Sequence, residues 1–108
     1  METSVERAAR NEAVFRDANE LIERKLSDLS LVEGRSPFVC ECDDPGCTDI
    51  VRLTLAEYEH VRSNPVWFLI APGHPVVAGE IVSRDERFEV VEKQGRAAEI
   101  AEQRDPRS

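Results

Sequence analysis

The sequence of 108 residues lacks any long hydrophobic run, and it has only two histidines and two lysines. No stretch approaches the roughly 18 apolar residues of a membrane-spanning helix, and no basic leader precedes an apolar segment. The glycine-rich phosphate loop and the G-x-S-x-G and H-E-x-x-H signatures of hydrolases do not occur either. These absences predict a cytoplasmic protein without membrane contact, and they give no motif on which to base an enzymatic activity.

Positive charge is also scarce, because 14 Lys and Arg residues stand against 22 Asp and Glu residues, a formal net charge of −8. Nucleic-acid affinity depends first on the neutralisation of phosphates by basic side chains, and an anionic membrane repels an acidic protein for the same reason. No run of basic residues interrupts this balance. The composition therefore disfavours nucleic acid and membrane surfaces, and we expect a protein partner.

Cysteine occurs only three times, and all three residues lie within one short stretch. Cys40, Cys42 and Cys47 form the pattern C-x-C-x4-C, with the turn-forming pair Pro45-Gly46 before the last of them. In a reducing cytoplasm, closely spaced thiols indicate metal or redox chemistry rather than structural disulfides. We expect three thiolate ligands of a structural Zn²⁺ ion. A redox-active thiol cluster and a set of buried apolar cysteines are the alternatives.

A tetrahedral zinc site requires a fourth ligand, and either histidine could supply it. His74 lies in the loop Pro72-Gly73-His74-Pro75, where a restricted backbone can direct the imidazole, so we expect His74 to complete a Cys3His set. His60 lies in an expected helix and is the competing ligand. Carboxylates are rarer in closed zinc sites. The carboxylate candidates are Asp43, Asp44 and Asp49. Of these, Asp44 is more typical of a turn residue.

The N-terminal segment, from residue 3 to about residue 30, has the pattern of one long amphipathic helix. Thr3 and Glu6 match the capping box that starts many helices. We expect this helix either to pack on its own domain or to pair with a second copy of the chain. The predicted apolar face consists of Ala8, Phe15, Ile22 and Leu29, with Val5, Ala18 and Leu26 nearby. The predicted opposite, charged face consists of Arg7, Arg10, Glu20, Glu23 and Arg24. Polar groups along the helix, Asn11, Arg16, Asn19 and Glu20, are expected to be solvated, with a docking surface for a partner as the alternative.

The rest of the chain alternates short strands and helices. A second capping box, Thr54 with Glu57, predicts a helix over residues 55 to 63. The apolar run 66 to 71, bounded by prolines, predicts a buried strand. Residues 50 to 53 and 87 to 93 also have strand character, 76 to 83 is ambiguous between helix and strand, 97 to 103 favours a short helix, and 105 to 108 is expected to fray.

The predicted fold class is α+β, with a long N-terminal amphipathic helix and a small zinc-stabilised domain. We expect that domain to contain a short antiparallel sheet and one or two short helices. The predicted organisation is a helical arm over residues 1–33, a zinc-binding core over 34–95 and a C-terminal helix and tail over 96–108. Because the core is small, we expect it to need a metal ion for stability.

The chain resembles, over nearly its full length, a family of small bacterial proteins with a zinc-finger-like domain. The stretches that carry this resemblance are 10–16 with Asn19 and Glu20, 38–42 with Cys47, 53–62, 72–74 and 90–93. The resemblance implies a zinc site and favours His74 as a ligand, but it implies no activity. The cysteine spacing also resembles the zinc-binding segment that follows the SET domain of histone methyltransferases, over eight residues only.

The function expected from these patterns is that of a small cytoplasmic zinc-binding protein that acts as an interaction or regulatory module. Its partner would be another protein or a second copy bound through the N-terminal helix. A thiol-based redox switch that releases zinc is the first alternative. A small zinc enzyme with Glu41 as its base is the least favoured alternative, because a Cys3His set leaves zinc no open position.

Overall fold

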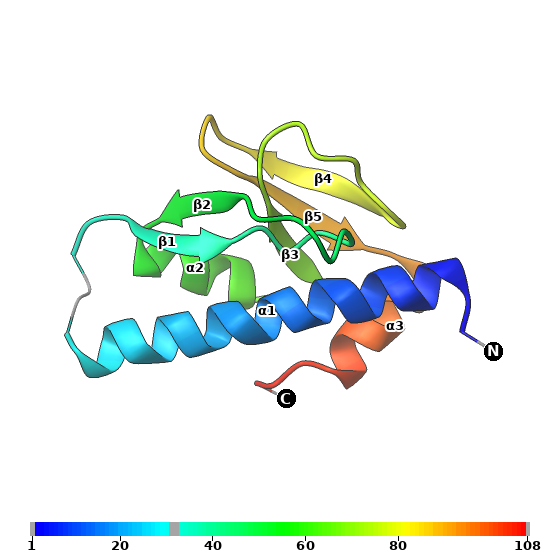
Figure 1. The fold of residues 1–108 in the computed structure, drawn as a ribbon, viewed down its shortest axis with the longest axis horizontal. Helices are drawn as coiled ribbons and strands as arrows, with labels where there is room; N and C mark the ends of the chain where they lie inside the picture. Colours follow the sequence, from blue (N-terminus) through cyan, green and yellow to red (C-terminus); the bar gives the residue numbers. More distant parts are fainter. Residues whose placement is uncertain (1, 31–32, 108) are drawn as a thin grey trace.

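The computed structural model describes residues 2–30 and 33–107. The predicted α+β class is confirmed, because a long N-terminal helix is followed by two small antiparallel sheets and two short helices (Figure 1). No helix within the described ranges is long and apolar enough to cross a membrane. The elements are α1 (Ser4–Asp28), β1 (Ser36–Val39), β2 (Ile50–Leu53), α2 (Leu55–Arg62), β3 (Trp67–Ile70), β4 (Gly79–Arg84), β5 (Glu89–Lys93) and α3 (Gly95–Gln103).

Both capping boxes predicted from the sequence form. At the start of α1, the Thr3 hydroxyl accepts a hydrogen bond from the Glu6 amide, and the Glu6 carboxylate accepts one from the Thr3 amide. Thr54 and Glu57 make the same exchange at the start of α2. The backbone amides of the first turn of a helix have no hydrogen-bond acceptor within the helix, and each capping box supplies acceptors for such amides.

The five strands form two separate antiparallel sheets. β1 and β2 pair as a two-stranded ribbon in which Phe38 lies opposite Val51. The second sheet has the strand order β3-β5-β4, with Phe68 opposite Val91. The segment 76 to 83, which the sequence left ambiguous, provides most of β4, an edge strand whose pairing with β5 contains a register shift.

The hydrophobic core draws on both sheets and on α2. Phe38 of β1 stacks on Tyr58 of α2, with ring centroids 4.5 Å apart and an interplanar angle of 6°. The run predicted as a buried strand forms β3, and its residues Phe68, Leu69 and Ile70 are buried. α1 lies across these elements along the longest dimension of the molecule, which measures 43 Å (Figure 1).

The face of α1 that packs on the body is largely polar, and this corrects the prediction of a solvated polar face. Arg16 and Asn19 are 0% exposed and Glu20 is 6% exposed. Leu29, predicted for the inward face, is 55% exposed. The members of the predicted apolar face that do pack against the body are Ala8, Phe15, Ile22 and Leu26.

Hydrogen bonds from distant parts of the chain explain why α1 can bury charged side chains. The Arg16 guanidinium donates to the backbone oxygens of Pro65, at 2.7 Å, and Ala101, at 2.8 Å. Glu20 accepts from the buried Arg62 side chain at 2.8 Å. Because these partners lie 42 to 85 positions later in the chain, the periodicity of the helix alone cannot reveal them.

The C-terminal segment that was expected to fray takes part in the same network. Asp105 accepts a hydrogen bond from Arg62. Arg107 donates to Glu20 at 2.9 Å and to Glu59 at 2.7 Å. The described part of this segment, which ends at residue 107, is therefore tied by ion pairs to both α1 and α2.

The Glu12–Lys93 ion pair between α1 and β5 gives a test of this polar interface. Their side chains are 5% and 3% exposed. Glu12→Ala leaves the buried ammonium group without its carboxylate, so we expect the free energy of unfolding to fall by about 3–5 kcal/mol, measured by urea denaturation. The control is Asp17→Ala, which removes a 47% exposed carboxylate from the same helix. The control should change stability by less than about 0.5 kcal/mol, and a similarly small effect of Glu12→Ala would contradict the proposed role of the pair.

Candidate metal centre

The three cysteines lie in the loop that connects β1 to β2. Cys40 directly follows β1, and its amide donates to the Asp49 carbonyl oxygen at 3.1 Å, so the pairing of the ribbon continues into the loop. At the tip, the Cys47 amide donates to the Asp44 carbonyl oxygen at 3.0 Å, and the Gly46 amide donates to the Asp44 carboxylate at 2.9 Å. The turn predicted from Asp-Pro-Gly therefore forms and brings Cys47 back toward Cys40.

Glu41 accounts for the common direction of its two cysteine neighbours. Its amide donates to the Leu69 carbonyl oxygen at 2.7 Å, and its fully buried carboxylate accepts hydrogen bonds from Asn19 at 2.8 Å and from the Leu69 amide at 2.9 Å. Alternate side chains of an extended segment point to opposite sides. Because the Glu41 side chain points toward α1 and β3, the side chains of Cys40 and Cys42 both point to the other side of the segment.

His74 comes from the loop between β3 and β4, far from the cysteines in sequence. Gly73 precedes it with a φ of 80°, a conformation that glycine adopts without strain, and the His74 amide donates to the Ala71 carbonyl oxygen at 3.3 Å. The ring lies between two groups. Nδ1 is 3.7 Å from Cys40 Sγ, and Nε2 is 2.6 Å from an Asp49 carboxylate oxygen.

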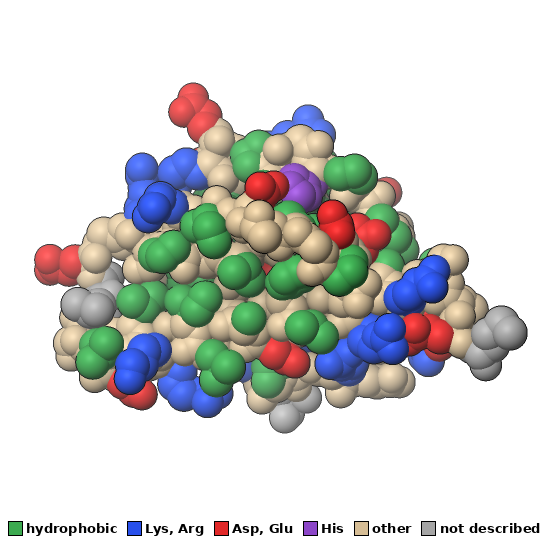
Figure 2. Space-filling model, in the orientation of Figure 1, with side chains coloured by type: hydrophobic (Ala, Val, Ile, Leu, Met, Phe, Trp, Pro, Cys, Tyr) green, Lys and Arg blue, Asp and Glu red, His purple; other side chains and the backbone are tan. Residues whose placement is uncertain are grey.

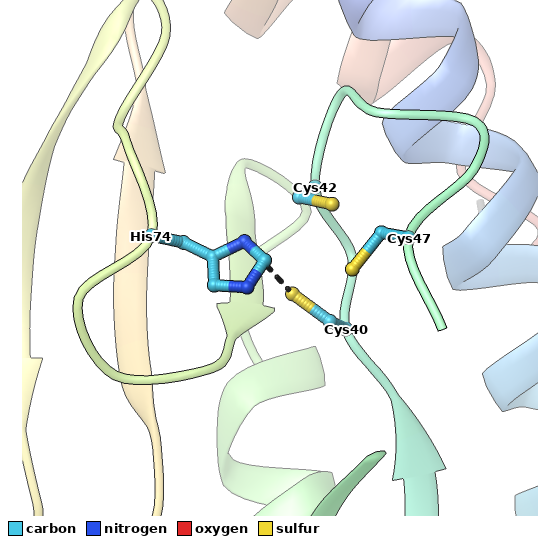
Figure 3. Close-up of side chains that lie close together, drawn as sticks. All are labelled: Cys40, Cys42, Cys47 and His74. Atoms are coloured by element: carbon cyan, nitrogen blue, oxygen red, sulfur yellow. Dashed lines mark hydrogen bonds between the residues drawn. The ribbon is translucent and has the colours of Figure 1, made fainter. Parts of the chain in front are cut away.

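The four side chains converge on one point, as Figure 3 shows. One ligand atom from each of Cys40, Cys42, Cys47 and His74 lies within 4.8 Å of all the others. A tetrahedral zinc ion with Zn–S near 2.3 Å and Zn–N near 2.0–2.1 Å places its ligand atoms roughly 3.5–3.8 Å apart. The Cys40–His74 distance of 3.7 Å falls in that range. The cluster could therefore hold a metal ion, and its sulfur and imidazole donors suit Zn²⁺ better than Mg²⁺ or Ca²⁺.

The other residues considered as ligands or as a base lie elsewhere. His60 is exposed on α2, where its ring is tilted against Trp67 with centroids 5.6 Å apart. Asp44 closes the turn, and Asp49 contacts the far side of the imidazole. Glu41, the candidate base, has both carboxylate oxygens hydrogen-bonded inside the protein.

Burial dominates the electrostatics of the cluster. It raises the pKa of the Cys40 thiol above its usual range and that of Cys42 to about 11. The Ala71 amide, which donates to Cys40 Sγ at 3.3 Å, opposes this rise for Cys40. Burial also raises the pKa of Glu41 to about 7, while hydrogen bonds from Asn19 and Leu69 oppose the increase. A cation at this point would stabilise the thiolate forms that burial disfavours.

Asn19 is a supporting residue that the sequence analysis placed on the surface. Its side-chain amide donates to the Val39 carbonyl oxygen and to Glu41, and its oxygen accepts from the Val39 amide, each at 2.8 Å. Asn19 thus pairs with β1 as a neighbouring strand would. Nearby, Asn11 donates to the Asp43 carbonyl oxygen at 3.0 Å. The only sequence signal was a pair of asparagines eight residues apart on one helix.

No family model, curated protein or solved structure matches the chain. Of what the resemblance noted from the sequence implies, the structure contains the Cys3His cluster, which could bind a metal ion. What the site does must be inferred from its own geometry.

The contact between Asp49 and His74 predicts a role for Asp49 in metal affinity. An ionised carboxylate can only accept a hydrogen bond, so Asp49 favours the His74 tautomer that carries its proton on Nε2 and turns an unprotonated Nδ1 toward the cysteines. Asp49→Ala should weaken Zn²⁺ binding about 10- to 100-fold in a chelator competition titration. Asp49→Asn keeps an acceptor and should lose less. Asp28→Ala, at the exposed end of α1, is the control, and an affinity of Asp49→Ala equal to that of Asp28→Ala would contradict the prediction.

Proposed function

We propose that this chain is a small zinc-binding protein in which one Zn²⁺ ion is held by Cys40, Cys42, Cys47 and His74. The observation that supports the proposal is the convergence of four donor atoms within 4.8 Å from two separate loops. Four protein ligands of this type are characteristic of structural zinc sites, which leave no position for water or substrate. We therefore propose a structural site rather than a catalytic one.

The position of the cluster suggests what the ion would stabilise. The cysteines belong to the β1–β2 loop and His74 to the β3–β4 loop, so the ion would bridge the two sheets. Structural zinc in small finger peptides contributes an apparent free energy of about 10–16 kcal/mol at neutral pH. A contribution of this order is large beside the roughly 5–15 kcal/mol that stabilises a typical domain.

The biological role that we propose is that of an interaction or regulatory module in the cytoplasm. A closed metal site, a net charge of −8 and a long helix on the outside of the body favour a protein partner over a small substrate, nucleic acid or a membrane.

The proposal predicts one zinc ion per chain, lost when a single ligand is removed. In native mass spectrometry Cys42→Ser should retain almost no zinc, because a tetrahedral site with three ligands binds far more weakly. Its thermal midpoint should fall by more than about 10 °C, since each kcal/mol shifts the midpoint of a small domain by about 4–8 °C.

The two histidines provide a matched pair for the same measurement. His74→Ala should lose zinc, whereas His60→Ala should keep it, because His60 lies outside the cluster on α2. The reverse result would overturn the ligand assignment. A wild-type protein, purified without chelator, that binds no zinc when the metal is added would overturn the proposed function.

A thiol switch is the second candidate function, favoured by the partial exposure of Cys47 beside the buried Cys40 and Cys42. Hydrogen peroxide would take two electrons from two of the thiolates. A sulfur–sulfur bond forms, the peroxide O–O bond breaks, two protons from solvent complete two water molecules, and the metal ion leaves. Zinc release measured with a chromophoric chelator should then be complete at about one peroxide per chain and reversed by thiol reductant. Release only at large peroxide excess would argue against a switch.

A further inference from the structure

The outer face of α1 presents large aliphatic side chains to solvent. This outer stripe follows the 3-4 spacing of a helix that packs against another helix. At its centre Val14 is 54% exposed and Leu21 is 62% exposed, with the partly buried Ala18 between them. The stripe consists of Arg7, Arg10, Val14, Asp17, Ala18, Leu21, Arg24, Lys25 and Asp28. Figure 2 shows hydrophobic side chains along α1 with basic side chains toward both of its ends.

The inward face of α1 combines apolar residues that pack on the core, such as Phe15 and Ile22, with buried polar ones. α1 buries Glu12, Arg16, Asn19 and Glu20 against the body and exposes valine and leucine. Covering a Val or Leu side chain that is otherwise in water favours association. With 25 residues α1 is about 37 Å long, which is sufficient for a second helix to lie along it.

The charges of the outer stripe indicate the chemistry of what covers it. Four basic residues stand against two carboxylates, in a chain whose net charge is −8. The Asp17 carboxylate lies 3.9 Å from Arg104 Nη2, and Arg10 Nη1 lies 3.2 Å from the Glu2 carboxylate. The basic residues of the stripe that have no ion-pair partner among residues 2–30 and 33–107 are Arg7 at one end and Arg24 and Lys25 at the other.

We propose that the outer stripe is the docking site for an acidic amphipathic helix of a partner protein. Aliphatic residues of the partner would cover Val14 and Leu21, and its carboxylates would pair with Arg7, Arg24 and Lys25. This inference rests on the interaction role proposed above and gives that role a surface and a class of partner.

A second copy of the chain fits the charges less well. An antiparallel pair of α1 helices with Val14 opposite Leu21 places Arg10 opposite Lys25, although it also places Arg7 opposite Asp28. A parallel pair places each cation beside its own copy. Both arrangements bring together two faces with excess positive charge, and like charges across an interface oppose association. An anionic membrane would attract the cations, but the aliphatic centre is narrow and the chain as a whole is strongly acidic.

Two designed helical peptides of about 21 residues, with the same leucine stripe, test the proposal. One carries glutamates beside the stripe and the other carries lysines. In fluorescence anisotropy with zinc-loaded protein at low salt, the acidic peptide should bind at least about 10-fold more tightly than the basic one. Leu21→Ser should weaken that binding about 10-fold, whereas Val82→Ser, which removes a 43% exposed valine from β4, should not.

Charge reversal gives a second measurement. The double variant Arg24→Glu, Lys25→Glu should bind the basic peptide more tightly than the acidic one. Equal binding of both peptides, or binding of neither, would overturn the proposal. So would Leu21-dependent dimerisation in analytical ultracentrifugation, or Leu21-dependent binding to phosphatidylglycerol vesicles without peptide binding. A chain that binds no zinc in the same samples would instead refute the metal site, whatever the peptides do.

Discussion

Residue 41 connects the Cys3His cluster to the rest of the fold. Its side chain is fully buried, and its carboxylate accepts hydrogen bonds from α1, through Asn19, and from β3, through the Leu69 amide. The two residues beside it, Cys40 and Cys42, are consequently directed into the cluster. A change at either cysteine and a change at Asn19 therefore act on one continuous structure. This link relates the packing of α1 to the geometry of the site.

The interface between α1 and the body contains several buried polar and charged side chains. Glu12–Lys93 and Glu20–Arg62 are buried ion pairs, a kind of contact that often contributes no more net stability than apolar packing of the same volume, because both partners lose their hydration. They are, however, costly to break singly. Arg16 combines two backbone hydrogen bonds with a position 4.5 Å from the centre of the Phe68 ring, where the guanidinium interacts with the aromatic face. The body thus accepts α1 by matching charges and hydrogen-bonding groups.

Local signals in the sequence were sufficient for most of the fold. Two Thr-x-x-Glu boxes marked helix starts, and a proline-bounded apolar run marked β3, because these patterns act within a few residues. The cysteine spacing and the Pro-Gly-His loop also predicted the residues that the structure brings together. The orientation of α1 could not be predicted in the same way. Whether Asn19 or Glu20 is solvated depends on partners in β1, α2 and the C-terminal segment, which no periodicity encodes.

The inward polar contacts of α1 also fix the position of the helix along its own axis. From Glu12 to Glu20 they extend over about 12 Å of the helix axis, and each is matched to a different partner, in β1, β5, α2 or a connecting segment. Aliphatic packing tolerates sliding by a turn, whereas these pairs would all be mismatched at once. The helix therefore has a single axial register and a single rotation relative to the cysteine loop. The inward contacts of α1 therefore also fix the position of the side chains on its outer face, relative to the body, for any molecule that binds there.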